Sequence, residues 1–339
     1  MKNVNVKIAA DVALLILAGG VVQAQRGPQA SDRPPLVPPI TIRSSPEEIQ
    51  RTAAITRAGR KLTPKTWPNG TRVAVGFSFD VDNELLFNAR PLPVPMSQGE
   101  YGAITGLPRI LELLERQHVP ASFFIPAMSL MLHPDMLRQI QKSGMHEVGV
   151  HGWVHESLTS VGGPEEEQRL LTRSIDYLTQ AMGKRPVGYR APSWIWTPDT
   201  PQQVAQAGFL YDSSLMAMDQ PYEVLANGKA TGLIELPISW IVDDYPYYGE
   251  NGDGSLPSPE AVFQIYKDEF DTAYREKTLF ILTNHPHISG HGSRVAQLDK
   301  LITYMKSKPG VWFGTLEQIA KYLKEQNPPV PDDGGAARR

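Results

Sequence analysis

Short apolar runs alternate with amphipathic helical patterns along most of the chain. The runs are nearly continuous in apolar residues, as in strands buried on both faces of a parallel sheet. We predict strands at residues 72–79, 121–126, 146–151, 186–191, 232–237, 278–285 and 311–314. A helical period predicts helices at residues 107–117, 134–144, 164–183, 259–276 and 295–307.

Two further helices are predicted from their start signals. Ser45 and Glu48 form a capping-box pattern with Pro46 in the first turn, which predicts a helix over residues 46–60. The stretch "TLEQ", which begins at Thr315, has the same pattern and predicts the last helix. Strand and helix thus alternate about seven times, which favours a parallel α/β barrel or an open doubly wound sheet.

Polar residues gather where four of the predicted strands end. They are Asp80 and Asp82, His151, Arg190, and His285. In both candidate architectures ligands bind beyond the C-terminal ends of the strands. We therefore expect these five side chains to form one site.

Composition excludes several kinds of chemistry. The 339 residues are 41% hydrophobic and 20% charged, which is typical of a globular protein. A formal net charge of −3 gives no general attraction to nucleic acid. The chain has no cysteine, so disulfides, thiol nucleophiles and cysteine-ligated zinc are excluded.

The N-terminus has the pattern of an export signal. Lys2 and Lys7 precede the apolar stretch "VALLILAGGVV", and "VQA" ending at Ala24 matches a cleavage site. We predict a signal peptide at residues 1–24, a proline-rich arm at 25–70, a catalytic domain at 71–325 and a disordered tail at 326–339. The apolar stretch is short for a bilayer span, so an exported protein without a stable membrane anchor is expected.

The stretch "HGWVHE" indicates a metal site. It places His151 and His155 four positions apart, and in a helical turn the two imidazoles would lie on one face. Together with one carboxylate from Asp80 or Asp82 they would make a facial metal site with open positions. Zinc lowers the pKa of a bound water to about 7, and the second carboxylate could accept the proton of that water.

The same residues fit other kinds of site less well. A calcium loop fails on spacing, because Leu85 stands where glycine is needed and Pro91 where glutamate is needed. The stretch "HPHISGH" could form a separate histidine site, but we favour His285 alone as a proton donor to a leaving amine. Arg190 could hold a neighbouring carboxylate ionised.

Substrate contacts are expected from two aromatic stretches and one long insertion. Ser193 and Trp194 follow Arg190 in "YRAPSW", and Tyr245 lies in "SWIVDDYPYYGENGDG". These three residues are our candidates for substrate binding. The insertion at residues 83–106 follows the first strand directly, so it is expected to overhang the site as a lid.

The motifs "SFDVD", "HGWVH", "RAP", "YDSSL" with "ELP", and "LTNHP" resemble, in this order, those of the polysaccharide deacetylases with NodB homology, carbohydrate esterase family 4. The resemblance covers residues of about 71 to 325. It implies an α/β fold, a distorted (β/α)7-type barrel with a single catalytic domain. It also implies one divalent metal, commonly zinc, and hydrolysis without a covalent intermediate.

By this resemblance, roles can be assigned residue by residue. The metal ligands are Asp82, His151 and His155. Asp80 is the general base, Arg190 orients it, His285 is the general acid and Asp212 supports that acid. Three positions depart from the common pattern, where Val81 separates the aspartates, Gly152 replaces serine or threonine, and Ser193 replaces tyrosine.

The motifs are most similar to a branch that includes a peptidoglycan deacetylase, allantoinase-like proteins and cyclic imide hydrolases. We therefore expect hydrolysis of a non-peptide C–N bond, first in an N-acetylated cell-wall polysaccharide or amino sugar and second in a small cyclic imide or amide. Zinc is the expected metal, with cobalt, manganese, nickel or iron as alternatives. An iron(II) oxygenase, a non-catalytic sugar-binding module and a homo-oligomeric assembly all stay open.

Overall fold

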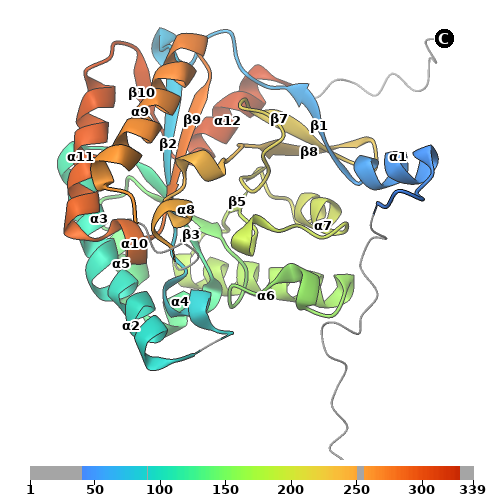
Figure 1. Cartoon of the computed structure of the whole chain (residues 1–339), viewed down its shortest axis with the longest axis horizontal. Helices are drawn as coiled ribbons and strands as arrows, with labels where there is room; N and C mark the ends of the chain where they lie inside the picture. The colour runs from blue at the N-terminus through green and yellow to red at the C-terminus, as the bar shows by residue number, and fades with distance from the viewer. Residues whose placement is uncertain (1–39, 90, 250–255, 329–339) are drawn as a thin grey trace, which may run out of the picture. The chain divides into compact units, whose positions relative to one another are not determined.

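A ten-stranded sheet organises the chain in the computed structural model, which describes residues 40–89, 91–249 and 256–328 (Figure 1). The strand order is β1-β7-β8-β6-β5-β4-β3-β2-β10, and β9 pairs with β2. The strands are β1 (Thr56–Lys61), β2 (Val73–Asp80), β3 (Ala121–Ile125), β4 (Glu147–Val150), β5 (Gly188–Tyr189), β6 (Tyr211–Asp212), β7 (Tyr222–Ala226), β8 (Lys229–Glu235), β9 (Leu279–Asn284) and β10 (Val311–Phe313).

All the strand pairs except two are parallel. The exceptions are β7 with β8 and β1 with β7, which are antiparallel. Within the described residues β9 pairs with β2 and not with the β1 end of the sheet, so the barrel is open. This curled half-barrel sheet in a single α/β domain confirms the predicted fold class.

Strand β2 lies at the centre of the core because every one of its eight residues is buried. It pairs with β3, β9 and β10. The rings of Phe79 and Phe123, on neighbouring strands, stack with centroids 5.2 Å apart. An unbroken apolar run therefore became a strand covered on both faces, as its pattern predicts.

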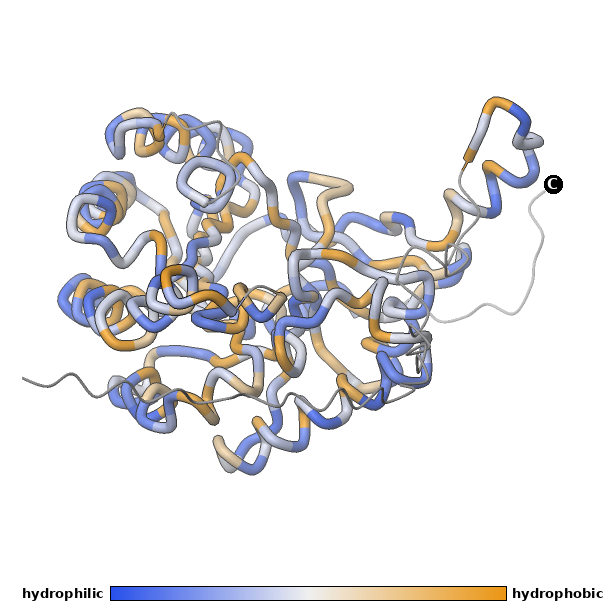
Figure 2. Tube along the Cα trace, turned by 60° about the horizontal axis from the view of Figure 1, so that its bottom comes forward, coloured by the Kyte–Doolittle hydropathy of each residue, from blue (hydrophilic) through white to orange (hydrophobic). Residues whose placement is uncertain are grey.

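Helices cover the sheet and turn apolar sides toward it, so hydrophobic and hydrophilic positions alternate along them in Figure 2. In Figure 1, α3, α9 and α11 lie together beside β2 and β9, away from β1 and β7. The main helices are α1 (Pro46–Ala54), α2 (Pro93–Tyr101), α3 (Leu107–Gln117), α4 (Ala127–Leu132), α5 (Asp135–Gln141), α6 (Pro164–Met182), α7 (Thr200–Gln206), α8 (Tyr245–Tyr248), α9 (Pro259–Glu276), α10 (Pro286–Ser289), α11 (Gly292–Lys306) and α12 (Leu316–Gln326).

Each of the seven predicted strands is present, and both predicted capping boxes form at Ser45 and Thr315. The helix predicted over residues 46–60 is too long, because it ends at Ala54 and residues 56–61 form β1 against β7. Strands β1, β6 and β7 were not predicted. Strand β6 has only two residues, too few for any periodicity.

The insertion after β2 is mostly helical. It contains a 3-10 helix η3 (Asn83–Phe87), helix α2 and a π-helical turn η4 (Gly102–Gly106) that continues into α3. Glycine lets η4 approach α10 closely: a Cβ on Gly106 would lie 2.1 Å from the carbonyl oxygen of Pro286. The insertion is therefore packed on the segment that follows β9.

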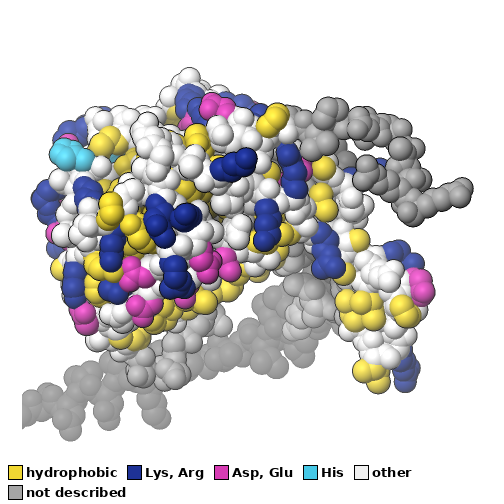
Figure 3. Space-filling model, turned by 90° about the horizontal axis from the view of Figure 1, so that it is seen from above, with side chains coloured by type: hydrophobic (Ala, Val, Ile, Leu, Met, Phe, Trp, Pro, Cys, Tyr) yellow, Lys and Arg dark blue, Asp and Glu magenta, His cyan; other side chains and the backbone are white. Residues whose placement is uncertain are grey.

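Positive and negative side chains are interspersed on the face shown in Figure 3. Among the described residues no helix combines the length and the hydropathy that a bilayer crossing requires. The predicted signal peptide at residues 1–24 and most of the predicted tail lie outside the described residues.

Candidate metal centre and active site

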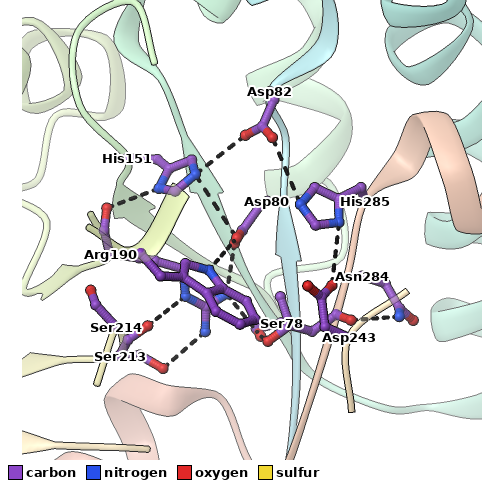
Figure 4. A network of polar contacts seen from close by, with 12 residues as sticks. Ser78, Asp80, Asp82, His151, Arg190, Ser213, Ser214, Asp243, Asn284 and His285 are labelled. Atoms are coloured by element: carbon purple, nitrogen blue, oxygen red, sulfur yellow. Dashed lines mark hydrogen bonds and ion pairs between the residues drawn. The ribbon is translucent and has the colours of Figure 1, made fainter. Parts of the chain in front are cut away.

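The end of β2 brings Asp80 and Asp82 close to His151, the first histidine of "HGWVHE" (Figure 4). Asp82 Oδ1 lies 3.3 Å from His151 Nε2, and Asp82 Oδ2 lies 3.6 Å from His155 Nε2. All three side chains are buried or nearly so, with exposed fractions of 1%, 1% and 7%. The structure thus brings together the three residues that sequence reasoning assigned to a metal.

The two histidines meet through a bend and not through a helical turn. Residues 151–155 contain no helix, and both Gly152 and His155 have left-handed backbone, with φ of 78° and 56°. The Glu156 carboxylate accepts the backbone N–H groups of Trp153 and Val154 and so stabilises this bend. The imidazole centroids of His151 and His155 are 5.2 Å apart.

The position after His151 requires glycine. A Cβ at Gly152 would lie 2.7 Å from Cγ of Pro192, and its positive φ is strained for any other L-residue. The departure from serine or threonine noted in the sequence therefore has a local steric reason.

The arrangement of these ligand atoms fits a divalent cation. One ligand atom from each of Asp82, His151 and His155 lies within 4.8 Å of the other two, so a single ion could be held by all three. Asp82 Oδ1 is buried and has no hydrogen-bond partner. His151 Nδ1 lies 2.8 Å from the carbonyl oxygen of Arg190, so its N–H donates there and Nε2 keeps its lone pair toward Asp82.

Electrostatics keep Asp82 ionised. Burial alone would raise the pKa of its carboxyl, but His155, His151 and His285 outweigh burial and hold that pKa below its ordinary value. An ionised carboxylate beside two imidazoles is the donor set that zinc uses in catalytic sites.

Asp80 is held from two sides and points toward the same centre. Arg190 Nη1 donates to Asp80 Oδ1 at 2.6 Å, and the indole Nε1 of Trp194 donates to Oδ2 at 3.2 Å. Burial would raise the pKa of Asp80, but the charges of Arg190, His151 and His285 lower it below its ordinary value. Asp80 is therefore an ionised, oriented carboxylate whose Oδ2 lies 3.9 Å from His151 Nε2.

Arg190 is fixed by hydrogen-bond acceptors around its guanidinium. It is fully buried, and besides Asp80 it donates to Ser78 Oγ at 3.1 Å and to the carbonyl oxygen and Oγ of Ser213 at 2.7 and 2.9 Å. Its guanidinium carbon lies 4.2 Å from the ring centroid of Phe124. These contacts hold the Arg190 guanidinium in one orientation. Its hydrogen bond to Asp80 in turn orients that carboxylate.

His285 lies across Asp82 from His151 (Figure 4). Its Nε2 is 3.7 Å from Asp82 Oδ2, and its Nδ1 is 2.7 Å from Asp244 Oδ1. Asp244 also accepts the backbone N–H of His285 and the hydroxyl of Ser289. Burial lowers the pKa of His285, but Asp244, Asp243 and Asp82 outweigh it and raise that pKa well above the ordinary value.

The structure corrects the prediction that Asp212 supports His285. Asp212 accepts hydrogen bonds from the N–H and hydroxyl of Ser214 and lies against Glu235 at the end of β6. The carboxylate that contacts His285 is Asp244. Asp244 is the second aspartate of "SWIVDDYP". Nothing in the sequence indicated that this aspartate contacts His285 in the folded chain.

The three candidates for substrate binding have different positions. Trp194 is buried against Asp80, whereas Ser193 is exposed, and both have left-handed backbone with φ of 58° and 53°. The ring of Tyr245 lies over His285, with centroids 5.7 Å apart. Sequence reasoning missed Trp240, whose ring stacks on that of Trp194 with centroids 4.2 Å apart.

Comparisons with known proteins agree with this geometry. A family model described as "Polysaccharide deacetylase" matches residues 100–211. The chain is 30% identical to the peptidoglycan deacetylase of Helicobacter pylori over 289 residues, which cover 76% of this chain and 98% of that protein.

Two solved structures have similar folds. One is from Mycobacterium smegmatis and is assigned to the polysaccharide deacetylases; it has a TM-score of 0.73 and 37% identity, covering 80% of this chain and 96% of that one. The other is the allantoinase PuuE, with a TM-score of 0.69 and 26% identity, covering 78% of this chain and 94% of that one.

Proposed function

Since the chain belongs to the polysaccharide deacetylase family, we propose that it hydrolyses the N-acetyl amide of an amino sugar in cell-wall polysaccharide. One observation carries this proposal. The buried cluster of Asp82, His151 and His155 has an oriented carboxylate, Asp80, and the imidazole of His285 beside it. A base and an acid thus lie beside one cation site.

In the proposed reaction Asp80 is the general base. Its Oδ1 accepts from Arg190 and its Oδ2 from Trp194, and Oδ2, which lies 3.9 Å from the ligand atom Nε2 of His151, is the oxygen that takes a proton from the attacking water. The water oxygen bonds to the acyl carbon as Asp80 receives that proton. Arg190 and Trp194 keep Asp80 oriented through this step because both donate to it.

His285 is the proposed general acid. Asp244 binds its Nδ1–H, which leaves Nε2–H facing the cluster and free to donate. The leaving nitrogen takes this proton as the C–N bond breaks, and acetate and a free amine are released. A carboxylate that raises the pKa of an imidazole keeps it protonated until the leaving group needs the proton.

Asp82, His151 and His155 would hold the divalent cation, which we propose is zinc from the nitrogen and oxygen donors. When bound there, the cation supplies Lewis-acid activation of the water and of the amide carbonyl. Arg190 orients two residues of the site. Its carbonyl oxygen accepts from Nδ1 of the ligand His151, and its guanidinium donates to the base Asp80.

We also propose that the enzyme is exported, on the strength of the lysine, apolar and cleavage-site pattern in residues 1–24. An exported enzyme would meet cell-wall glycans. The 30% identity to a peptidoglycan deacetylase over nearly that protein's whole length supports the same substrate class.

A second candidate function is hydrolysis of a small cyclic imide or amide. The similarity to PuuE allantoinase over 94% of that chain favours it. Both reactions break a C–N bond beside a carbonyl, so the same base and acid would serve either.

A substrate screen separates the two functions. The purified, zinc-loaded protein is incubated with N-acetylglucosamine oligomers, with peptidoglycan and with cyclic imides, each with and without chelator. Chelator-sensitive release of acetate from the sugars supports deacetylation. Ring opening of an imide without acetate release from any sugar would favour the second function, and binding without turnover of any substrate would indicate a sugar-binding module.

A further inference from the structure

Two of the sequence motifs, "YDSSL" and "ELP", take no part in the proposed reaction. Each contains one acidic residue, Asp212 at the end of β6 and Glu235 at the end of β8, and the two are paired across these parallel strands. Both side chains are completely buried. Burial of two neighbouring acidic groups is costly, and the contacts of the pair indicate what it holds in place.

One proton joins the two carboxyl groups. Asp212 Oδ2 and Glu235 Oε1 accept from the same backbone N–H, that of Ser214, at 2.8 and 3.1 Å. Two ionised carboxylates so close together, and away from water, would repel each other strongly. Burial and the neighbouring Asp212 raise the pKa of Glu235 well above its ordinary value, so Glu235 is the neutral member. Among the described residues no other donor reaches Glu235 Oε2, so this oxygen carries the proton and donates it to Asp212.

The acid pair holds the turn that follows β6. This strand ends at Asp212, and the next N–H groups have carboxyl oxygens as acceptors in place of a neighbouring strand. Glu235 Oε1 accepts the N–H of Leu215 at 3.0 Å as well as that of Ser214. Asp212 Oδ1 accepts the hydroxyl of Ser214 at 2.9 Å. The path of residues 213–215 is therefore determined by the two acidic side chains.

The same turn holds the arginine that orients the base. Two of the four hydrogen bonds of the Arg190 guanidinium go to Ser213, whose carbonyl oxygen and Oγ accept at 2.7 and 2.9 Å. The hydroxyl of Ser214 accepts the backbone N–H of Ala191, the next residue, at 2.9 Å. Arg190 in turn donates to Asp80 at 2.6 Å. A continuous series of buried contacts thus leads from the acid pair to the base.

We propose that Glu235 is a positioning residue for the general base. As a neutral acid bound to Asp212 it fixes the turn at residues 213–215, the turn fixes Arg190, and Arg190 orients Asp80. The inference rests on the proposed role of Asp80 and goes beyond it, because it extends the support of the base to a side chain on β8 that contacts neither the cation site nor the base. A glutamine at position 235 could accept the same N–H groups and donate to Asp212, so Glu235→Gln should keep the turn in place.

The kinetic test is a double-mutant cycle on zinc-loaded protein, with the substrate that wild type hydrolyses best. Glu235→Leu removes the acceptor of two N–H groups, and we expect kcat to fall about tenfold or more while KM and the zinc content change little. Glu235→Gln should recover most of this loss. In an Arg190→Lys background the further loss caused by Glu235→Leu should be small, because Arg190 transmits the effect.

Glu147→Leu is the matched control. Glu147 is also a buried glutamate of this sheet, but it lies at the start of β4 and accepts from Ser122 and Tyr211. Its loss should lower stability and leave kcat per zinc-loaded chain near that of wild type. Equal falls in kcat in the two leucine variants would overturn the proposal, as would losses that multiply in the double variant of the cycle. If Glu235→Leu does not fold, Glu235→Asp replaces it with the same expectations, since its carboxyl is one methylene too short for the turn.

A second measurement does not depend on turnover. The Nε–H of Arg190 is buried and donates to the carbonyl oxygen of Ser213, so it should exchange slowly with water. In ¹⁵N NMR spectra its signal is identified by its absence in Arg190→Lys. We expect exchange to be about tenfold faster in Glu235→Leu than in Glu147→Leu, and slow again in Glu235→Gln.

This measurement separates the proposal from the proposed function. If wild type hydrolyses no substrate, the proposed function fails, and the exchange of the Arg190 Nε–H alone decides whether Glu235 holds the arginine. Faster exchange confined to Glu235→Leu supports the positioning role. Exchange that is the same in both leucine variants overturns it, whether or not the protein is active.

Discussion

Asp244 Oδ1 lies 2.7 Å from Nδ1 of His285 and turns Nε2 of that imidazole toward Asp82. The contact joins the segment before α8 to the end of β9, two parts of the chain that are separated by α9. It determines both the protonation and the orientation of the proposed acid. We therefore expect the loss of Asp244 to impair the proposed reaction through His285.

Replacing Asp244 with Asn should lower activity and change its pH dependence. The Asp244 carboxylate raises the pKa of His285, so its removal lowers that pKa. The imidazolium is then lost at a lower pH, and the alkaline limb of the kcat–pH profile should move to lower pH. A pH–rate profile of Asp244→Asn checks this, with the surface carboxylate variant Asp299→Asn as control. An unmoved alkaline limb would show that Asp244 does not act through His285.

Replacing Asp80 with Asn should abolish turnover without loss of metal. The amide cannot accept the proton from water, and general-base catalysis is worth about 10²–10⁴-fold. Asp80 is not among the three clustered ligands, so the metal content should stay that of wild type. Acetate release and elemental analysis on the same preparation measure both. Activity within tenfold of wild type would remove Asp80 from the mechanism.

The conservative change Arg190→Lys should be severe. A lysine keeps the charge but cannot donate at once to Ser78, Asp80 and Ser213 as the guanidinium does. Misplacement of a catalytic group by about 1 Å can cost ~10²-fold in rate, and we expect a loss of this size in kcat. Steady-state kinetics test it against Arg173→Lys, since Arg173 stacks on Trp153. Wild-type kcat in Arg190→Lys would contradict an orienting role.

The residues that could be predicted from the sequence are those that occupy strand ends. Asp80, Arg190 and His285 each follow a buried apolar run, and parallel strands bring such positions to one edge of a sheet. The apolar runs were therefore sufficient to predict that Asp80, Arg190 and His285 lie close together, because the order of parallel strands alone brings their ends to one edge.

The sequence could not show which residues contact each other where the contact depends on the path of a loop. Asp212 ends a strand of two residues, and its side chain contacts Ser214 and not His285, whereas Asp244 reaches His285 from an irregular segment. Strand β1 was also missed, because its residues "TRAGRK" carry three charges and become a strand only by pairing with β7. Pairing at an edge overrides weak local preference.

Asp212 should make stability depend on pH. Burial raises its pKa to about 6, although hydrogen bonds from Glu235 and Ser214 act against this. An unfolded Asp loses its proton near pH 4, so stability should fall as pH rises from about 4 to about 6 and then level off, by up to about 3 kcal/mol. Asp212→Asn cannot ionise.

Urea unfolding of chelator-treated protein at pH 4.5, 5.5 and 6.5 measures this slope. The difference in the free energy of unfolding between wild type and Asp212→Asn should shift in favour of the variant as pH rises. Groups that do not touch Asp212 cancel in this difference, which therefore reports the Asp212–Glu235 pair. A constant difference across this range would mean that Asp212 is ionised throughout.

The central claim is that Asp82, His151 and His155 together hold one catalytic divalent cation. Elemental analysis of the purified protein and of His151→Ala, joined to acetate release from an N-acetylglucosamine oligomer before and after chelation, tests it most directly. We predict one ion per chain in wild type, loss of the ion in the variant, and activity that chelation removes and zinc restores. Full activity in protein that contains no divalent metal would contradict the claim.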